Sequence, residues 1–140
     1  MTYTIDDLKP GMSESFSKTV SERDVTLFGE ISGDMNPVHF DEAYAKTTIF
    51  GGRIVHGVLV LSYLSTVLGT KMPGPGAIFL SQTTSFKAPA RIGDTVTAIC
   101  TVREVIPARR RVIFDCICKV KDTVVVEGEA TVMMPSRKAA

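Results

Sequence analysis

The sequence predicts an α+β fold in which a long antiparallel β-sheet wraps around one apolar α-helix. The first observation is the segment 57–68, whose apolar residues cover most of a helix circumference. Such a pattern is typical of a helix that is buried nearly all round. The second observation is that the chain after this segment consists of long strand-like runs joined by short connections, which favour an antiparallel sheet. Wrapping the sheet around the helix buries the apolar faces of both.

The composition is that of an ordinary globular protein. The chain has 140 residues, of which 44% are apolar and 22% are charged, and we expect a single domain over residues 1–140. A formal net charge of +1 gives no reason to expect nucleic acid or an anionic membrane as a partner. No apolar run reaches the roughly 18 residues that cross a bilayer, and the N-terminus lacks the layout of a signal peptide.

The segment before the apolar helix predicts one strand and two shorter helices. The strand covers residues 14–20, and the first helix covers Glu22–Ser32. Ser21 is a suitable N-cap for this helix and Gly33 is a suitable C-cap, so the helix should end just before the polar loop that follows. A short second helix is expected over residues 41–46.

The C-terminal half predicts four strands, because it contains runs rich in Val, Ile, Thr and Phe with turn residues between them. These strands span residues 77–87, 95–105, 111–120 and 123–134.

The polar loop after the first helix carries the residues most suited to catalysis. Asp34 and His39 are five residues apart, so they converge only if the chain turns between them, and Asn36-Pro37 supplies that turn. A carboxylate and an imidazole, with unperturbed pKa values of about 3.9 and about 6.5, can hold one water and move protons near neutrality. Asn36 can bond the loop backbone or orient Asp34. The same residues also form a good turn for structural reasons alone.

The entry to the apolar helix offers a second polar feature. The first backbone N–H groups of a helix are unpaired and lie at the positive end of its dipole, so the amide of Gly57 can stabilise an oxyanion. The alternative is that Gly51, Gly52 and Gly57 only make turns. His56 either caps the helix or bonds the turn, which we favour, or takes part in catalysis.

Two further features are open from the residues alone. Ser62 and Ser65 interrupt the apolar helix and either bond back to its carbonyls or, for Ser65, which lies two turns beyond Gly57, face a substrate. Neither lies in a Gly-x-Ser-x-Gly elbow, which argues against a serine hydrolase. The basic run 109–111 is either a solvated turn or a contact for a phosphate-bearing ligand.

The three cysteines are Cys100, Cys116 and Cys118. Cys116 and Cys118 occupy alternate positions of a predicted strand, so both should point to one face. We expect reduced structural thiols in a cytoplasmic protein, with no metal site and no cofactor, because further metal ligands are not nearby in the sequence.

Three motifs resemble the signature of the R-specific enoyl-CoA hydratases, the MaoC-like branch of the hot-dog fold. The motifs are Gly33-Asp34-Met35-Asn36-Pro37-Val38-His39, Gly51-Gly52-Arg53-Ile54-Val55-His56-Gly57, and Phe86-Lys87-Ala88-Pro89 with Gly93-Asp94. The first is fairly specific, whereas the last is shared by many hot-dog proteins. The resemblance extends from about residue 20 to about residue 132.

The resemblance implies a hydro-lyase that reversibly adds water to a trans-2-enoyl thioester, carried by CoA or by acyl carrier protein, to give the R-3-hydroxyacyl thioester. It makes Asp34 and His39 the catalytic pair that shares the water. It also implies a homodimer in which two sheets join edge to edge. The expected oxyanion and substrate-binding residues are Gly57, Asn36, Ser65, Val55 and His56.

Two other functions compete with the hydratase. A hot-dog thioesterase would release a free thiol, but the Asp-x-Asn-Pro-x-His loop argues against it. A non-catalytic acyl-CoA-binding protein would bind the thioester without turnover.

Overall fold

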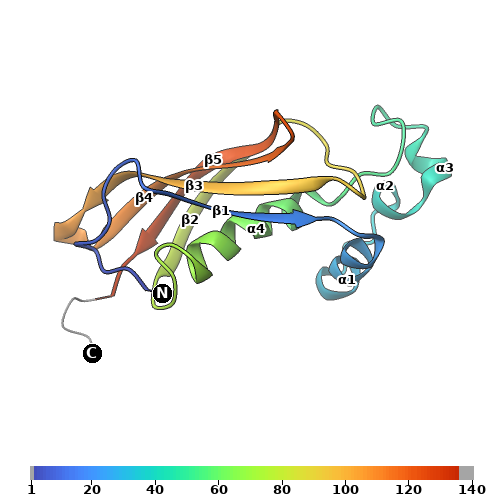
Figure 1. Cartoon of the computed structure of the whole chain (residues 1–140). Coiled ribbons are helices and arrows are strands. Elements are labelled where there is room, and N and C mark those ends of the chain that lie inside the picture. The colour runs from blue at the N-terminus through green and yellow to red at the C-terminus, as the bar shows by residue number, and fades with distance from the viewer. Residues whose placement is uncertain (1, 136–140) are drawn as a thin grey trace.

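One five-stranded antiparallel sheet lies over a long helix, and three shorter helices gather at one end (Figure 1). The computed structural model describes residues 2–135. The helices are α1 (Glu22–Ser32), α2 (Pro37–Phe40), α3 (Glu42–Ala45) and α4 (Gly57–Thr70). The strands are β1 (Ser13–Thr19), β2 (Ile78–Phe86), β3 (Thr95–Ile106), β4 (Arg111–Val120) and β5 (Thr123–Met133), and they lie in the order β1-β3-β4-β5-β2. The predicted α+β fold, with the sheet around a central helix, is confirmed.

The core lies between α4 and the sheet. The buried side chains of α4 are Leu59, Val60, Tyr63, Leu64, Val67 and Leu68. The expectation that α4 is buried nearly all round is wrong along one strip, where Val58 is 56% exposed and Ser65 is also exposed. The sheet covers only one side of the helix, so the opposite side stays open in a single chain. Within residues 2–135, no helix is both long enough and apolar enough to cross a membrane.

The cysteines belong to the contact between the sheet and α4. All three are free and buried, and the Sγ atoms of Cys100 and Cys116 lie 3.7 Å apart. A hydrogen bond from Cys116 and burial raise the pKa of Cys100, and burial raises the pKa of Cys118 to about 12. Cys100 and Cys118 are therefore thiols and not thiolates, and all three buried cysteines act as small core side chains. The prediction of reduced structural thiols is confirmed.

The caps of α1 fix where the polar loop starts. Ser21 and Asp24 form a reciprocal capping box, and Gly33 ends the helix with a φ of 80°. The left-handed conformation at Gly33 turns the chain away from the helix axis without a steric penalty. Asp34 therefore begins the loop directly outside the helix end, as predicted.

The loop itself contains a helical turn that was not predicted from the sequence. Asn36 caps this turn, α2, because its Oδ1 accepts the Val38 N–H at 3.1 Å. Pro37 begins α2, because its fixed φ and missing N–H suit a first helical position. The turn buries His39 and is followed by α3, which Asp41 caps as expected.

The contact between β2 and β5 depends on one glycine. A Cβ built on Gly128 would lie 1.8 Å from the carbonyl oxygen of Thr83. Because a backbone oxygen cannot turn aside, Gly128→Ala must push β2 away from β5. We expect the free energy of unfolding to fall by about 3 kcal/mol, towards the upper end for overpacking, as measured by urea denaturation.

Gly69→Ala provides the matched control. Gly69 lies in α4, and apart from its chain neighbours and the backbone of its own helix, no atom of the described residues lies within 4 Å of the place that a Cβ would take there. Alanine is the better helix former by roughly 1 kcal/mol, so this variant should be at least as stable as the wild type. Equal unfolding midpoints for Gly128→Ala and the wild type would contradict the close approach.

Candidate active site

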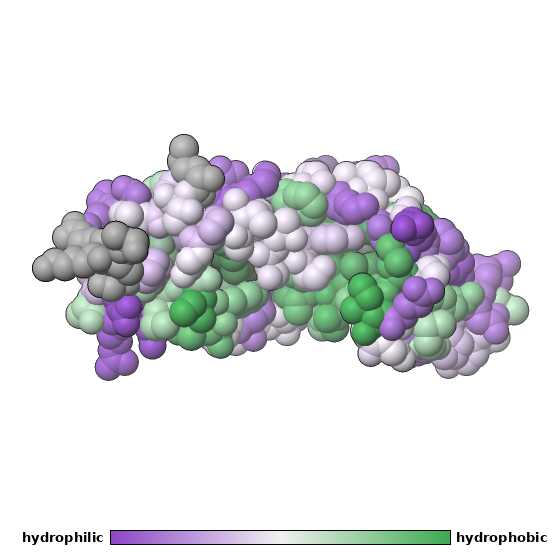
Figure 2. Space-filling model, turned by 90° about the horizontal axis from the view of Figure 1, so that it is seen from below, coloured by the Kyte–Doolittle hydropathy of each residue, from purple (hydrophilic) through white to green (hydrophobic). Residues whose placement is uncertain are grey.

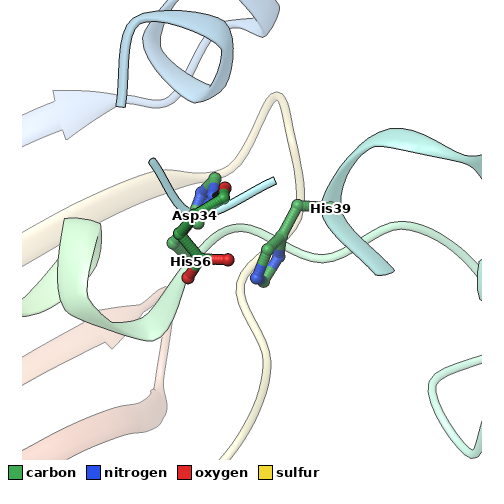
Figure 3. Close-up of side chains that lie close together, drawn as sticks. All are labelled: Asp34, His39 and His56. Carbon is green, nitrogen blue, oxygen red and sulfur yellow. Dashed lines mark hydrogen bonds between the residues drawn. The ribbon is translucent and has the colours of Figure 1, made fainter. Parts of the chain in front are cut away.

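Asp34, His39 and His56 converge from three segments of the chain (Figure 3). Asp34 lies in the loop after α1, His39 lies in α2, and His56 directly precedes α4. One carboxylate oxygen and one nitrogen of each ring lie within 4.8 Å of one another. Asp34 is exposed, whereas His39 and His56 are only 7% and 1% exposed. The site therefore has an open carboxylate beside two buried rings.

The protonation of His39 follows from its backbone partner. Its Nδ1 lies 2.9 Å from the carbonyl oxygen of Ile54. Since a carbonyl only accepts, Nδ1 carries the proton, and Nε2 of the neutral ring keeps a lone pair. Burial lowers the pKa of His39 below its ordinary value, and the Ile54 carbonyl and the Asp34 carboxylate only partly oppose that effect. His39 is thus a neutral base with a free Nε2.

Asp34 is held at both its main chain and its side chain. Its Oδ1 accepts the backbone N–H of Asn36 at 3.2 Å, and its carbonyl accepts the Nε2–H of His56 at 2.9 Å. No hydrogen bond joins the Asp34 carboxylate to either ring in the described part of the chain. Asn36 serves both purposes considered from the sequence, since its side chain bonds the Val38 N–H and its N–H orients Asp34.

Arg53 fixes the position of His39 through its backbone carbonyl, a role that was not predicted from the sequence. Its Nε donates to the His39 carbonyl at 2.7 Å, and its two terminal nitrogens bind the Glu22 carboxylate at 2.7 and 2.8 Å. Arg53 holds the pKa of Glu22 below its usual range, and the pair raises the pKa of Arg53. The bidentate geometry gives direction as well as attraction. Arg53 therefore connects α2 to the first turn of α1.

A second arginine, Arg91, stabilises the glycine-rich turn over residues 50–53 by hydrogen bonds to its carbonyls. Arg91 donates from its guanidinium to the carbonyls of Phe50, Gly52 and Arg53 at 2.6 to 3.2 Å. Its own N–H bonds the Asp94 carboxylate at 2.7 Å. These carbonyls have no strand partner, so the guanidinium supplies the donors that a ladder would otherwise provide. Arg91 lies 39 residues from Gly52, which explains why local sequence patterns did not reveal the contact.

Gly57 is the first residue of α4, and its N–H has no acceptor within residues 2–135. This amide is available to a substrate oxygen at the positive end of the helix dipole. A Cβ at this position would lie 2.7 Å from the Phe86 ring, so any larger residue here would have to displace that ring.

A cavity of about 380 Å³ opens beside the start of α4. Val55 and Gly57 line it together with Val58, Phe86 and Ala90, so its walls are mainly apolar. Such a shape suits an apolar chain whose polar end lies near the Gly57 amide. Of the predicted binding residues, Val55 and Gly57 lie on this cavity.

Ser65 and the basic run 109–111 are not brought to Asp34 and His39. Ser65 lies on the exposed strip of α4, about 12 Å along the helix from Gly57, and its hydroxyl has no partner in the described residues. Ser62 bonds back to the Leu59 carbonyl at 2.5 Å, as considered from the sequence. The run 109–111 lies at the connection from β3 to β4 and ends in the first residue of β4, at the end of the sheet opposite to α2 and α3 (Figure 1).

Asp34, His39 and His56 lie close enough together to be candidate metal ligands, but the orientation of the two histidine rings does not suit a metal ion. The rings are stacked, with centroids 3.8 Å apart and planes at 28°. Nitrogen lone pairs lie in the ring plane, so stacked rings direct them side by side instead of toward one point. One nitrogen of each ring also bonds a carbonyl. The geometry favours proton transfer.

Named relatives match nearly the whole chain. An (R)-specific enoyl-CoA hydratase from Rhodospirillum rubrum is 53% identical over 135 residues, which cover 96% of this chain and 94% of that protein. A 3-hydroxybutyryl-CoA dehydratase from Methylorubrum extorquens is 48% identical over 135 residues, which cover 96% of this chain and 86% of that protein.

Solved structures match the fold equally well. An R-hydratase from Pseudomonas aeruginosa in the unliganded form superposes with a TM-score of 0.90 at 38% identity, over 97% of this chain and 88% of that one. An (R)-hydratase from Aeromonas caviae gives a TM-score of 0.87 at 37% identity, over 91% and 98% of the two chains. The family model described as the MaoC like domain matches residues 8–129. The chain therefore belongs to the MaoC-like domain family.

Proposed function

We propose that this protein is an R-specific 2-enoyl-CoA hydratase, which adds water to a trans-2-enoyl thioester and catalyses the reverse dehydration. The observation that carries the proposal is the spacing of Asp34 and His39. Their nearest polar atoms lie within 4.8 Å of each other without a direct hydrogen bond, the separation at which one water can bridge two groups. The names of the relatives from R. rubrum and M. extorquens support the same reaction.

The water is activated by the pair. In hydration, the Asp34 carboxylate accepts one hydrogen bond from the water and orients it, while His39 Nε2 accepts the other hydrogen as a proton. The water oxygen attacks Cβ, and the electrons of the double bond move onto the thioester carbonyl. The imidazolium of His39 then gives its proton to Cα as the carbonyl re-forms. One hydroxyl and one hydrogen have been added, and both side chains return to their starting state.

The charge that develops on the thioester oxygen needs a donor, and the Gly57 N–H supplies it. The donor is fixed by the first turn of α4, so no reorganisation is needed when charge develops. The carbonyl then lies at the mouth of the apolar cavity, and Val55 contacts the acyl chain within it.

The acyl group enters this cavity whether CoA or acyl carrier protein holds the thioester. We assign the site to a single domain over residues 1–140. We also place the protein in the cytoplasm, because its three buried cysteines are free thiols, as expected in a reducing compartment.

The active form is proposed to be a homodimer joined through β2. Among the described residues, this strand pairs only with β5, so its outer edge carries free backbone groups there. Its exposed apolar side chains are Ile78, Phe79, Leu80 and Phe86, each at least 41% exposed. Viewed from the side of α4, green apolar patches are visible on the surface (Figure 2). An exposed apolar edge strand invites pairing, and a second copy satisfies it. In this proposed dimer, the exposed strip of α4 that carries Ser65 faces the region between the subunits where the substrate binds.

Asp34→Asn and His39→Gln test the catalytic pair. Each should lower kcat by roughly 10²- to 10⁴-fold with a smaller change in KM, because proton transfer is lost while the cavity remains. Hydration of a short trans-2-enoyl-CoA is followed by the loss of ultraviolet absorbance of the conjugated thioester, and the R product is identified by chiral chromatography.

Asp122→Asn makes the same chemical change in the exposed β4–β5 turn and should leave the rate unchanged. Full activity in both site variants would refute the mechanism. Release of free thiol without loss of the conjugated absorbance would indicate a thioesterase, and stabilisation by the ligand without turnover would indicate a binding protein.

The pH dependence tests the state of His39. Only the neutral ring accepts a proton, and burial lowers its pKa below the ordinary 6.5. The hydration rate should therefore stay level as the pH falls through 6.5 and decline only at lower pH. In Asp34→Asn, the carboxylate that raises the pKa of His39 is absent, so the decline of the residual rate should move to a still lower pH. A wild-type decline that begins above 6.5 would contradict this assignment.

Leu80→Lys tests the β2 edge. A lysine on an edge strand opposes strand pairing, so light scattering should show the wild type at twice the chain mass of 15.2 kDa and the variant at that mass. Ile49→Lys makes the same change at a 96% exposed residue outside the sheet and should remain dimeric. A monomeric wild type, or a Leu80→Lys variant that stays dimeric, would argue against this interface.

A further inference from the structure

We infer that His56 is a positioning residue that fixes Asp34 relative to the Gly57 amide. The inference rests on the proposed function and extends it, because it explains how the two halves of the site keep a fixed position relative to each other. The catalytic water is held by Asp34 and His39, whereas the thioester oxygen is held by the first amide of α4. These groups come from separate segments, and a small displacement between them is enough to lower the rate of reaction strongly.

His56 contacts both halves. Its Nε2 lies 2.9 Å from the main-chain carbonyl oxygen of Asp34, and the carbonyl can only accept, so Nε2 carries the proton. His56 is also bonded covalently to Gly57, as the residue directly before α4. A single side chain thus connects the oxyanion donor to the backbone that carries the catalytic carboxylate.

The ring of His56 has little freedom to move. It is 1% exposed and stacks on His39 with a centroid separation of 3.8 Å. The rings of Phe28 and Phe40 lie 4.8 and 5.6 Å away, tilted at 58° and 68°. Figure 3 shows the imidazoles of His39 and His56 beside Asp34. Because the surrounding rings restrict rotation of His56, its Nε2–H points in one fixed direction.

Packing alone does not account for an imidazole at this position. The other nitrogen, Nδ1, is buried, and no group in the described part of the chain bonds it. A buried polar atom without a partner costs free energy, and an aromatic hydrocarbon would fill the same space without that cost. The Nε2–H donor to Asp34 is the feature that a hydrocarbon ring lacks.

A matched pair of amides separates donor position from every other property of His56. In His56→Gln the amide nitrogen can occupy the place of Nε2 and reach the Asp34 carbonyl. In His56→Asn the same amide is one methylene shorter and lies near the place of Nδ1. We expect kcat of His56→Asn to fall about 100-fold and that of His56→Gln to stay within about 10-fold of the wild type, with KM changed less than about 3-fold in both. Equal kcat values for the two variants would overturn the inference.

The same pair in the Asp34→Asn background shows whether His56 acts through Asp34. When the carboxylate is already absent, His56→Gln and His56→Asn should differ by less than about 3-fold in the residual rate. A merely structural role for His56 would instead preserve the full difference between Gln and Asn in both backgrounds, and that result would also overturn the inference.

The tautomers provide a readout that does not depend on catalysis. Nitrogen-15 NMR of the imidazole rings in the wild-type protein should show the neutral ring of His56 protonated on Nε2 and that of His39 protonated on Nδ1. A His56 ring protonated on Nδ1 would refute the inference even if the protein is an active hydratase. Absence of hydration with the expected tautomers would refute the proposed function and leave the contact from His56 to Asp34 established.

Discussion

The structure around the site depends on the need to satisfy backbone carbonyls in a segment without strand partners. Side chains supply donors for several of these carbonyls. His56 bonds the carbonyl of Asp34, Arg53 bonds that of His39, and His39 bonds that of Ile54. Buried or half-buried carbonyls must find donors, so these contacts determine how the loop folds. The geometry of the candidate site is thus a consequence of backbone hydrogen bonding as much as of side-chain placement.

These hydrogen bonds also determine which nitrogen of each histidine ring carries the proton. In both rings the hydrogen-bond partner is a backbone carbonyl and not a charged group. A carbonyl oxygen selects which nitrogen carries hydrogen, and the two stacked rings are consequently protonated on different nitrogens. His39 keeps a free Nε2 where a water can lie, while His56 uses Nε2 for a backbone contact. Two residues of the same type therefore have different tasks, and their environment makes the distinction. The open carboxylate of Asp34 remains accessible to substrate and solvent.

Local patterns in the sequence predicted the strands, the central helix and the convergence of Asp34 with His39, because each depends on periodicity or on a turn signal within a few residues. The caps Ser21 and Gly33 were identified for the same reason. The contact of Arg53 with Glu22 joins residues 31 positions apart, and no short pattern reports such a pair. The exposed strip of α4 was missed because the apolar pattern of the helix does not distinguish a surface covered by its own sheet from one left open to another molecule.

Phe86 lies both on the edge strand proposed to pair with a second subunit and against the Gly57 amide proposed to bind the thioester oxygen. It belongs to the edge strand β2, is 55% exposed, and its ring occupies the space that a side chain at position 57 would need. A neighbour that binds along β2 therefore meets the same ring that lies against the oxyanion donor. In the proposed homodimer, dilution that separates the subunits would remove the neighbour beside this ring, so the specific activity should depend on the protein concentration.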